Sequence, residues 1–320
     1  MNFIITGSVA YDYIMSFPGY FRDHFLPDKL DSISLSFLVE SMVRRRGGTA
    51  PNIAYSMALL GERPRIMATV GEDFEEYRSW LESKGVDNSL VRVIPGEFTA
   101  SFFANTDRAN AQIASFYPGA MAYASELSLQ TILDPQPDLV VISPNDPKAM
   151  VGYVAECSQL GIPFLYDPSQ QIPRLSDEDL CFGVENARAL FINDYEFGLI
   201  NKCTGLTIEK ILERSEFIVI TRGEQGSTIY TREGETNIPI VLPEQVSDPT
   251  GVGDAFRGGF LTGYNHKFDW ETCGRMGALS ATYCVENLGP QGHEFSPSEF
   301  VARFRRYFDD GGQLDELLIT

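Results

Sequence analysis

The sequence is poor in positive charge, and this shortage excludes some partners. Its 25 Lys and Arg face 44 Asp and Glu, which gives a formal net charge of −19. A surface this negative repels nucleic acid and anionic lipid. We therefore expect a small-molecule partner, with no nucleic-acid or membrane partner. Backbone amides or one or two Arg must hold any anionic ligand.

Cysteine and histidine are too few and too scattered for a disulfide framework or a metal centre. The cysteines are odd in number and have no C-x-x-C spacing, so we expect reduced thiols at positions 157, 181, 203, 273 and 284. The histidines are isolated from one another at positions 24, 266 and 293. Neither a zinc site nor a stabilising disulfide is expected.

Several familiar segments and motifs are also missing. No apolar run approaches the length of a membrane span, and the start MNFIITGSVAYDYIM lacks the features of a signal peptide. These observations predict a cytoplasmic location. The sequence contains no G-x-x-x-x-G-K-[ST] loop, no dinucleotide-binding G-x-G-x-x-G and no hydrolase G-x-S-x-G elbow.

What the sequence does contain is an alternation of buried strands and helices. With 320 residues, 43% of them hydrophobic, the chain can form one large α/β domain, and we expect a single domain over 1–320. Nearly continuous apolar runs predict strands at 3–6, 65–69, 139–142, 164–166, 189–192 and 217–220. Intervening patterns predict helices at 51–60, 74–83, 147–160 and 208–214. The alternation predicts a mainly parallel sheet with helices on both faces and ligands at the carboxyl ends of its strands.

Two segments, about 10–46 and 97–117, break this alternation. Their alternating aromatic and β-branched residues, with a turn at Thr106–Arg108, predict a small antiparallel appendage folded over one edge of the main sheet. It is either a lid that excludes water or an edge extension that covers the sheet. The run Arg44–Arg46 could bind phosphate, but we interpret it as a solvated lid face.

The strongest chemical signal is DPTGVGDAFRGGF at 248–260, where a glycine turn runs into an amphipathic helix. The amides of Gly251, Val252 and Gly253 can hold an anion at the positive end of that helix. Asp254 lies in its first turn, where an acid either caps the helix or acts as a base. The two glycines and the second acid, Asp248, favour the functional interpretation.

A second glycine motif, GGTAPNIA, occupies 47–54. Gly47 and Gly48 allow a substrate to lie against the backbone, Pro51 is tolerated at a helix start, and Asn52 offers a donor and an acceptor to hydroxyls. Taken alone, the motif could equally be a helix entry with two turn glycines.

Together these motifs resemble those of the ribokinase-like (PfkB) sugar and nucleoside kinases. The late family signature D-T-x-G-A-G-D-x-F matches 248–256, with Pro249 in place of a usual hydroxyl residue and Val252 in place of Ala. GGTAPNIA resembles the early G-G-x-x-x-N motif. LLGERPRIMATVGEDF resembles L-G-x(n)-V-G-x-D-x-F-G, with Glu75 replacing the last glycine. The resemblance implies a three-layer α/β/α sandwich with a small β lid, and Asp254 as the catalytic base.

The resemblance also assigns roles to residues elsewhere in the chain. In the acceptor site it places Ser8, Asp12, Gly47, Gly48 and Asn52, with Asp12 binding sugar hydroxyls. In the ATP site it places Asn193, Thr221, Gly223, Gly226 and Asn287. Glu196, in the N-x-x-E motif, is expected to organise Mg²⁺ through water. The loops around Asp248 and 287–293 match places where relatives bind K⁺.

The lid segment and the late ATYCVENLGPQGHEF resemble the adenosine-kinase-like branch. This predicts ATP-dependent phosphorylation of the 5′-hydroxyl of a purine nucleoside, with adenosine as the first candidate. Phe102 and Phe116 are expected to face the base, while Phe103 points to the opposite face of its strand. Packing of the lid on itself or against a partner subunit is the alternative role of such aromatic residues. The alternatives are a sugar kinase of the ribokinase or fructokinase type and a non-catalytic ligand sensor. Either a monomer or a homodimer is compatible with the sequence.

Overall fold

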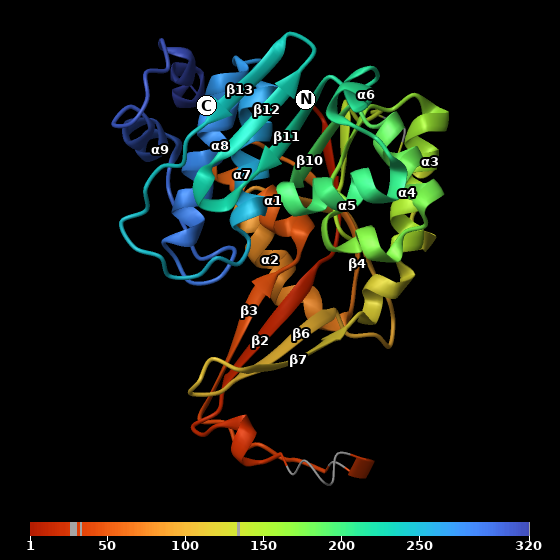
Figure 1. Cartoon of the computed structure of the whole chain (residues 1–320), viewed down its shortest axis with the longest axis vertical. Helices are drawn as coiled ribbons and strands as arrows, with labels where there is room; N and C mark the ends of the chain where they lie inside the picture. The colour runs from red at the N-terminus through yellow and green to blue at the C-terminus, as the bar shows by residue number, and fades with distance from the viewer. Residues whose placement is uncertain (26–30, 33, 133–134, 320) are drawn as a thin grey trace.

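The computed structural model, which describes residues 1–25, 31–32, 34–132 and 135–319, consists of a layered body and a projecting lid (Figure 1). Within these residues the body contains a nine-stranded sheet of order β13-β12-β11-β10-β9-β8-β1-β4-β5. Its pairings are parallel from β11 to β5, and the β11–β12 and β12–β13 pairings are antiparallel. The strands are β1 (Phe3–Thr6), β4 (Arg65–Val70), β5 (Asp87–Val93), β8 (Leu139–Ile142), β9 (Phe164–Tyr166), β10 (Ala189–Asn193), β11 (Phe217–Thr221), β12 (Ser227–Thr231) and β13 (Gly234–Ile238).

Helices cover both faces of this sheet (Figure 1). They are α1 (Thr49–Leu59), α2 (Glu75–Ser83), α3 (Pro147–Leu160), α4 (Asp177–Asn186), α5 (Asp194–Thr204), α6 (Ile208–Leu212), α7 (Val252–Asn265), α8 (Trp270–Val285) and α9 (Pro297–Phe304). Short 3₁₀ helices include η4 (Gly119–Glu126) and η5 (Leu129–Thr131). None of the helices in the described ranges combines the length and apolarity needed to span a bilayer.

Two hydrophobic cores, one on each face of the sheet, hold the layers together. The side chain of Ile5 joins a core with α1, α2, α7, α8 and α9, while its neighbour Ile4 joins a core with α3, α4, α5 and α6. Successive side chains of a strand point to opposite faces, so a strand buried on both faces must be apolar at every position. This requirement explains the continuous apolar runs in the sequence.

Local signals place several helix ends. Helix α3 begins where Asp146 accepts hydrogen bonds from the amides of Lys148 and Ala149, with Pro147 at its first position. It ends at Gly161, whose φ of 66° is left-handed. The six strands and four helices predicted from the alternation are all present, the strands with ends within one residue and the helices with ends within two residues. The helix predicted after the glycine turn is α7. The predicted sandwich fold is therefore confirmed.

The lid is a separate four-stranded sheet of order β3-β2-β6-β7. Its strands are β2 (Ala10–Ser16), β3 (Ser41–Gly47), β6 (Ala100–Thr106) and β7 (Gln112–Tyr117). The β2–β3 and β6–β7 pairs are antiparallel as expected, but the β2–β6 pair is parallel. Both β2 and β6 are outgoing strands of hairpins that leave and re-enter the body, so they run in the same direction.

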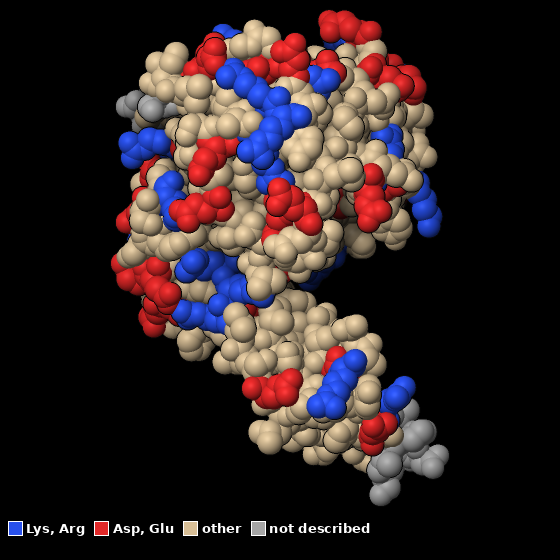
Figure 2. All heavy atoms as spheres, turned by 90° about the vertical axis from the view of Figure 1, so that its left-hand side faces the viewer, with Lys and Arg blue, Asp and Glu red and all other residues tan. Residues whose placement is uncertain are grey.

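The lid projects from the body instead of folding over the edge of the main sheet (Figures 1 and 2). Its strands hydrogen-bond to one another and form a sheet separate from that of the body. Figure 2 shows the molecule hollowed at the place where the lid leaves the body. Residues 26–30 and 33 of the predicted lid segment 10–46 lie outside the described residues.

Candidate active site

The glycine turn at 248–253 is held against the late loop at 287–293. Gly251 has a φ of 79°, and a Cβ atom there would lie 2.3 Å from Cβ of Pro290. Only glycine fits this left-handed, crowded position without strain. The Asp248 carboxylate accepts a hydrogen bond from the Thr250 amide at 2.9 Å, which closes the turn. Helix α7 then begins at Val252, so the amides of its first turn lie at the positive end of the helix.

Asp254 lies in the first turn of α7 and contacts the other glycine motif. The Asn52 Nδ2 atom donates to Asp254 Oδ2 at 2.8 Å, across 202 residues of sequence. Burial raises the pKa of Asp254 from 3.8 to about 6, although the Arg257 charge and the Asn52 hydrogen bond act in the opposite direction. A carboxylate with this pKa is mostly ionised at neutral pH and is a better proton acceptor than an ordinary one. The structure thus brings together two residues that the sequence singled out separately.

The orientation of the Asn52 amide is fixed from its other end. Gln291 Nε2 donates to Asn52 Oδ1 at 2.7 Å and also to the hydroxyl of Tyr77, which donates to the carbonyl of Gly47 at 3.0 Å. Because the oxygen of Asn52 is engaged by a donor, its NH₂ group must face Asp254. Neither Gln291 nor Tyr77 was predicted from the sequence. The only available signal for Gln291 was its position in the late GPQGHEF segment.

A buried ion pair lies one helical turn beyond Asp254. Arg257 Nη2 donates to Asp167 Oδ1 at 2.9 Å, and the Arg257 Nε atom lies 2.6 Å from Asp167 Oδ2. The two residues are 9% and 1% exposed. Burial raises the pKa of Asp167 to about 7, while Arg257 lowers it and the charges of Glu196 and Asp254 raise it further. Arg257 is therefore a fixed positive charge among three carboxylates.

Neither partner of this pair was predicted from the sequence. Arg257 was visible inside DAFRGGF. Asp167 directly follows the buried strand β9, and an acid at the carboxyl end of a parallel strand was the available signal.

Most of the residues predicted for the ATP site lie at or after the carboxyl ends of β10 and β11. Asn193 and Thr221, the last residues of these strands, are directly paired in the sheet. Asn193 and Glu196 form a reciprocal capping box at the start of α5, so these motif residues also have a structural role. Gly223 and Gly226 both have left-handed φ values, of 55° and 83°. Asn287 follows α8, and its side chain donates to the carbonyl of Tyr283 at 2.9 Å.

The donor set of Glu196 fits magnesium held through water. Its Oε1 atom accepts from the Ser169 hydroxyl at 3.0 Å and its Oε2 atom from the Asn193 amide at 2.8 Å. The described residues contain no group of three or more His, Cys, Asp or Glu arranged to hold a metal ion. Because each oxygen of a carboxylate can accept more than one hydrogen bond, Glu196 would hold a magnesium ion through the ion's own bound water.

The predicted acceptor residues lie where the lid meets the body. Gly48 has a φ of 96°, and a Cβ atom there would lie 2.4 Å from the carbonyl oxygen of Ser8. The side-chain hydroxyl of Ser8 accepts a hydrogen bond from the Thr49 amide. A Cβ atom on Gly47 would lie 2.7 Å from Oδ2 of Asp12. Burial and the Asp248 charge raise the pKa of Asp12 to about 6, and Arg45 opposes this rise. Ser8, Gly47, Gly48 and Asp12 therefore form one continuous patch.

A row of four residues crosses the lid sheet at the level of Asp12. Asp12 is directly opposite Arg45 on β3 and Phe102 on β6, and Phe102 is opposite Phe116 on β7. Directly opposed residues share one face of a sheet, so the carboxylate and the two aromatic rings lie on the same face. Phe103 points to the other face, where it stacks on Tyr13 with ring centroids 4.8 Å apart.

The run Arg44–Arg46 is not the solvated face that we expected. Arg44 pairs with Glu76 and lies over the ring of Tyr11, and Arg46 lies 4.1 Å above the ring centroid of Trp80. Arg45, on the face of Asp12, forms an ion pair with Asp248. The three side chains alternate between faces because they belong to a strand, so only one of them reaches the site.

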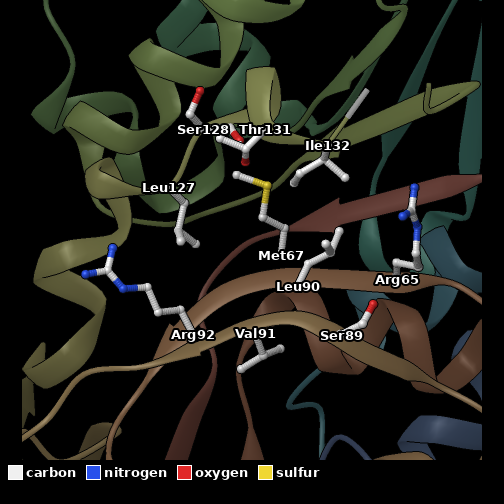
Figure 3. Close-up of a pocket in the computed structure, with 10 residues that line it drawn as sticks. All are labelled: Arg65, Met67, Ser89, Leu90, Val91, Arg92, Leu127, Ser128, Thr131 and Ile132. Carbon is white, nitrogen blue, oxygen red and sulfur yellow. The ribbon is translucent and has the colours of Figure 1, made fainter. Parts of the chain in front are cut away.

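A separate cavity of about 410 Å³ lies between β4, β5 and residues 127–132, which include η5 (Figure 3). Met67, Leu90, Leu127 and Ile132 form its apolar wall, with Arg65 and Arg92 on its flanks. None of its lining residues belongs to the site described above.

Comparisons with known proteins show which proteins this chain is similar to. The profile of the pfkB family carbohydrate kinases matches residues 10–295. A nucleoside kinase of Methanocaldococcus jannaschii is 30% identical over 304 residues, which are 94% of this chain and 96% of that protein. The structure of Burkholderia thailandensis nucleoside kinase in complex with inosine has a TM-score of 0.83 and 39% identity, covering 96% of this chain and 97% of that one. Its complex with ADP-inosine has a TM-score of 0.80 and 41% identity, covering 96% of each chain.

Proposed function

The chain belongs to the pfkB family of carbohydrate kinases and is an ATP-dependent kinase, and from this premise we propose that its acceptor is the 5′-hydroxyl of a purine nucleoside. Adenosine is the first candidate and inosine the second, because the similar Burkholderia structure contains inosine. The proposal names Asp254 as general base.

The observation that carries the proposal is the row on the lid. Asp12, Phe102 and Phe116 lie side by side on one face of the lid sheet. A carboxylate can accept hydrogen bonds from two ribose hydroxyls, and aromatic faces can bind a flat base. A free sugar needs polar groups around its whole ring, and the Phe102 and Phe116 rings do not supply them.

In the proposed reaction, Asp254 accepts the proton of the attacking hydroxyl while the Asn52 amide holds the carboxylate in place. The amides at 251–253 stabilise the negative charge of the transferred phosphoryl group. Glu196 would hold magnesium through water, and the ion would neutralise phosphate charge. Arg257 adds a fixed positive charge beside Asp254.

Potassium is not part of this proposal, although the family resemblance places a potassium loop around Asp248. The Asp248 Oδ2 atom already accepts from Arg45 and from the Gly289 amide, and a Cβ atom on Gly289 would lie 3.0 Å from Cδ of Arg45. A guanidinium between these two loops repels a monovalent cation. We expect equal rates in potassium and in tetramethylammonium at equal ionic strength, and a clear rise in potassium would reinstate the ion.

The test compares kcat/KM for adenosine, inosine, ribose and fructose with ATP and magnesium. We expect both nucleosides to exceed both sugars. A sugar that exceeded every nucleoside would contradict the nucleoside assignment while leaving the kinase assignment intact. Absence of ATP turnover with all acceptors would instead favour the ligand-sensor alternative.

A further inference from the structure

Arg45 forms a contact between the lid and the glycine turn at 248–253, which we call the catalytic turn because it leads to Asp254. It lies on β3, directly opposite Asp12, and its Nη1 atom is 2.6 Å from Oδ2 of Asp248. These two residues are separated by 203 positions in the sequence. The same Asp248 oxygen accepts from the Gly289 amide at 3.0 Å. Arg45 thus touches the turn that leads to Asp254 and the late loop that packs against Gly251.

We propose that Arg45 is a positioning residue that ties the acceptor-binding face of the lid to the catalytic turn through Asp248. The inference rests on the proposed roles of Asp12 and Asp254. Arg45 does not touch the reacting atoms in this proposal. It sets where Asp12, and the acceptor that Asp12 binds, lie relative to the base.

The burial of the pair distinguishes it from an ordinary surface ion pair. The side chains of Arg45 and Asp248 are 25% and 15% exposed, whereas those of Arg44 and Glu76 are 39% and 68% exposed. Exposed pairs contribute little, because water and salt screen them and two long side chains must be ordered. A shielded pair between the lid sheet and the glycine turn of the body is screened less and can hold lid and body in one arrangement.

Charge gives a second reason for the role. Asp12 and Asp248 are both acids, and their mutual repulsion disfavours the ionised form of Asp12. Arg45 is opposite one acid and bound to the other, so its charge offsets this repulsion. Without Arg45, the two carboxylates would repel each other across the junction of lid and body. We expect the lid to bind acceptors less well in that case.

The neighbouring arginine provides a matched control. Arg44 belongs to the same strand and has the same side chain, but it points to the opposite face, where it pairs with Glu76. We would compare Arg45→Met and Arg44→Met, since methionine keeps much of the apolar stem while removing the charge. Each variant is characterised by Tm, kcat, KM for the acceptor and KM for ATP.

For Arg45→Met we expect the KM of the acceptor to rise about tenfold while the KM of ATP changes less than twofold. Arg44→Met should stay within twofold of wild type in kcat and in both KM values, and Arg45→Lys should recover part of the loss because it restores a charge. An unchanged acceptor KM in Arg45→Met would overturn the proposal. Equal rises in both KM values together with a large fall in Tm would also overturn it, because they indicate a purely structural role.

A double variant tests whether Arg45 acts through Asp248. If it does, Arg45→Met should have a smaller effect in an Asp248→Asn background than in wild type. If the effects of Arg45→Met and Asp248→Asn simply multiply in the double variant, then Arg45 does not act through Asp248. All measurements use whichever acceptor has the highest kcat/KM in the wild type. A sugar acceptor would then contradict the proposed nucleoside function without compromising the test of Arg45.

Discussion

The proposed phosphoryl-transfer site in the body and the proposed acceptor-binding face of the lid are built differently. In the body, Asp254 is held by Asn52, Asn52 by Gln291, and Arg257 by Asp167, mostly among buried side chains. On the lid, every residue of the edge strand β7 is exposed, and 48% of Phe116 is open to solvent. In the body, each of these side chains is held by a hydrogen bond or ion pair to another. The geometry of the lid depends instead on strand pairing and on a few contacts at its base.

This difference matches the different roles proposed for the body and the lid. Transfer of a phosphoryl group requires atoms held to within fractions of an ångström, which a cross-braced network in a packed core can provide. Recognition of an acceptor requires a surface that can move and be re-formed around it. We therefore expect substitutions in the body to alter kcat and substitutions on the lid to alter acceptor KM.

The largest expected effect is that of Asp254→Asn on turnover. Asparagine has nearly the same shape but cannot accept a proton, so we expect kcat to fall by roughly 10²- to 10⁴-fold. Tm and ATP affinity, measured by calorimetry, should remain near wild type because the packing is unchanged. Turnover within about threefold of wild type would remove Asp254 from the mechanism.

The next effect is a loss of activity in acid, to which body and lid should each contribute. The pKa values of Asp254 and Asp12 are both raised from 3.8 to about 6, and the proposed roles require the ionised forms. Activity should therefore be complete well above pH 6 and decline as pH falls through about 6, with kcat/KM approaching two powers of ten per pH unit below it.

Asp12→Asn separates the two contributions to the pH profile. This variant has one titrating carboxylate fewer, so the acid limb of its kcat/KM profile should be reduced to about one power of ten per pH unit. A wild-type profile that is flat down to pH 5 would contradict both assignments. A limb of unchanged steepness in Asp12→Asn would contradict the role of Asp12 alone.

The smallest expected effect distinguishes the two faces of the lid. Phe102→Ala should lower kcat/KM for a nucleoside about tenfold, since stacking of a base on an aromatic ring contributes roughly 1–3 kcal/mol. Phe103→Ala removes a ring that stacks on Tyr13 on the other face, and it should change kcat/KM less than threefold. Free ribose, which has no base, provides the control and should not distinguish the variants. The reverse order of effects would mean that the opposite face of the lid binds the base.

The elements that could be predicted are those specified by neighbouring residues. Leu139–Ile142 and Phe164–Tyr166 were found with their observed ends, because a strand buried on both faces leaves a continuous apolar run. The pair β12 and β13 was not predicted, since Ser and Thr interrupt the apolar residues of β12 and the edge strand β13 is mostly exposed and polar. Helices α4, α5, α8 and α9 were also missed, although Asp269, Ser176 and Ser296 are recognisable N-caps.

The site was predicted as separate motifs, and its cross-connections were not. Asn52 and Asp254 were each identified from a local glycine pattern, but nothing local to either indicates that they share a hydrogen bond. Arg45 was misjudged because the sequence does not show which member of an arginine run faces the body. That outcome depends on the register of β3 against β2, which is fixed by the hydrogen bonds of the folded sheet.

The hydrogen bond from the Asn52 amide to Asp254 limits the ways in which Asp254 can lose the proton that it takes from the acceptor hydroxyl. In the proposed reaction Asp254 receives one proton in each cycle, yet its partners are the Asn52 amide, which already donates to it, and the Arg257 guanidinium, which stays charged. Neither group can carry a proton away, and Gln291, behind Asn52, is also an amide. The proton must therefore leave on the side of Asp254 that faces the acceptor. In the proposed reaction, regeneration of the base is then tied to departure of the product and entry of water, so product release restores the acid–base state of the enzyme as well as freeing its binding site.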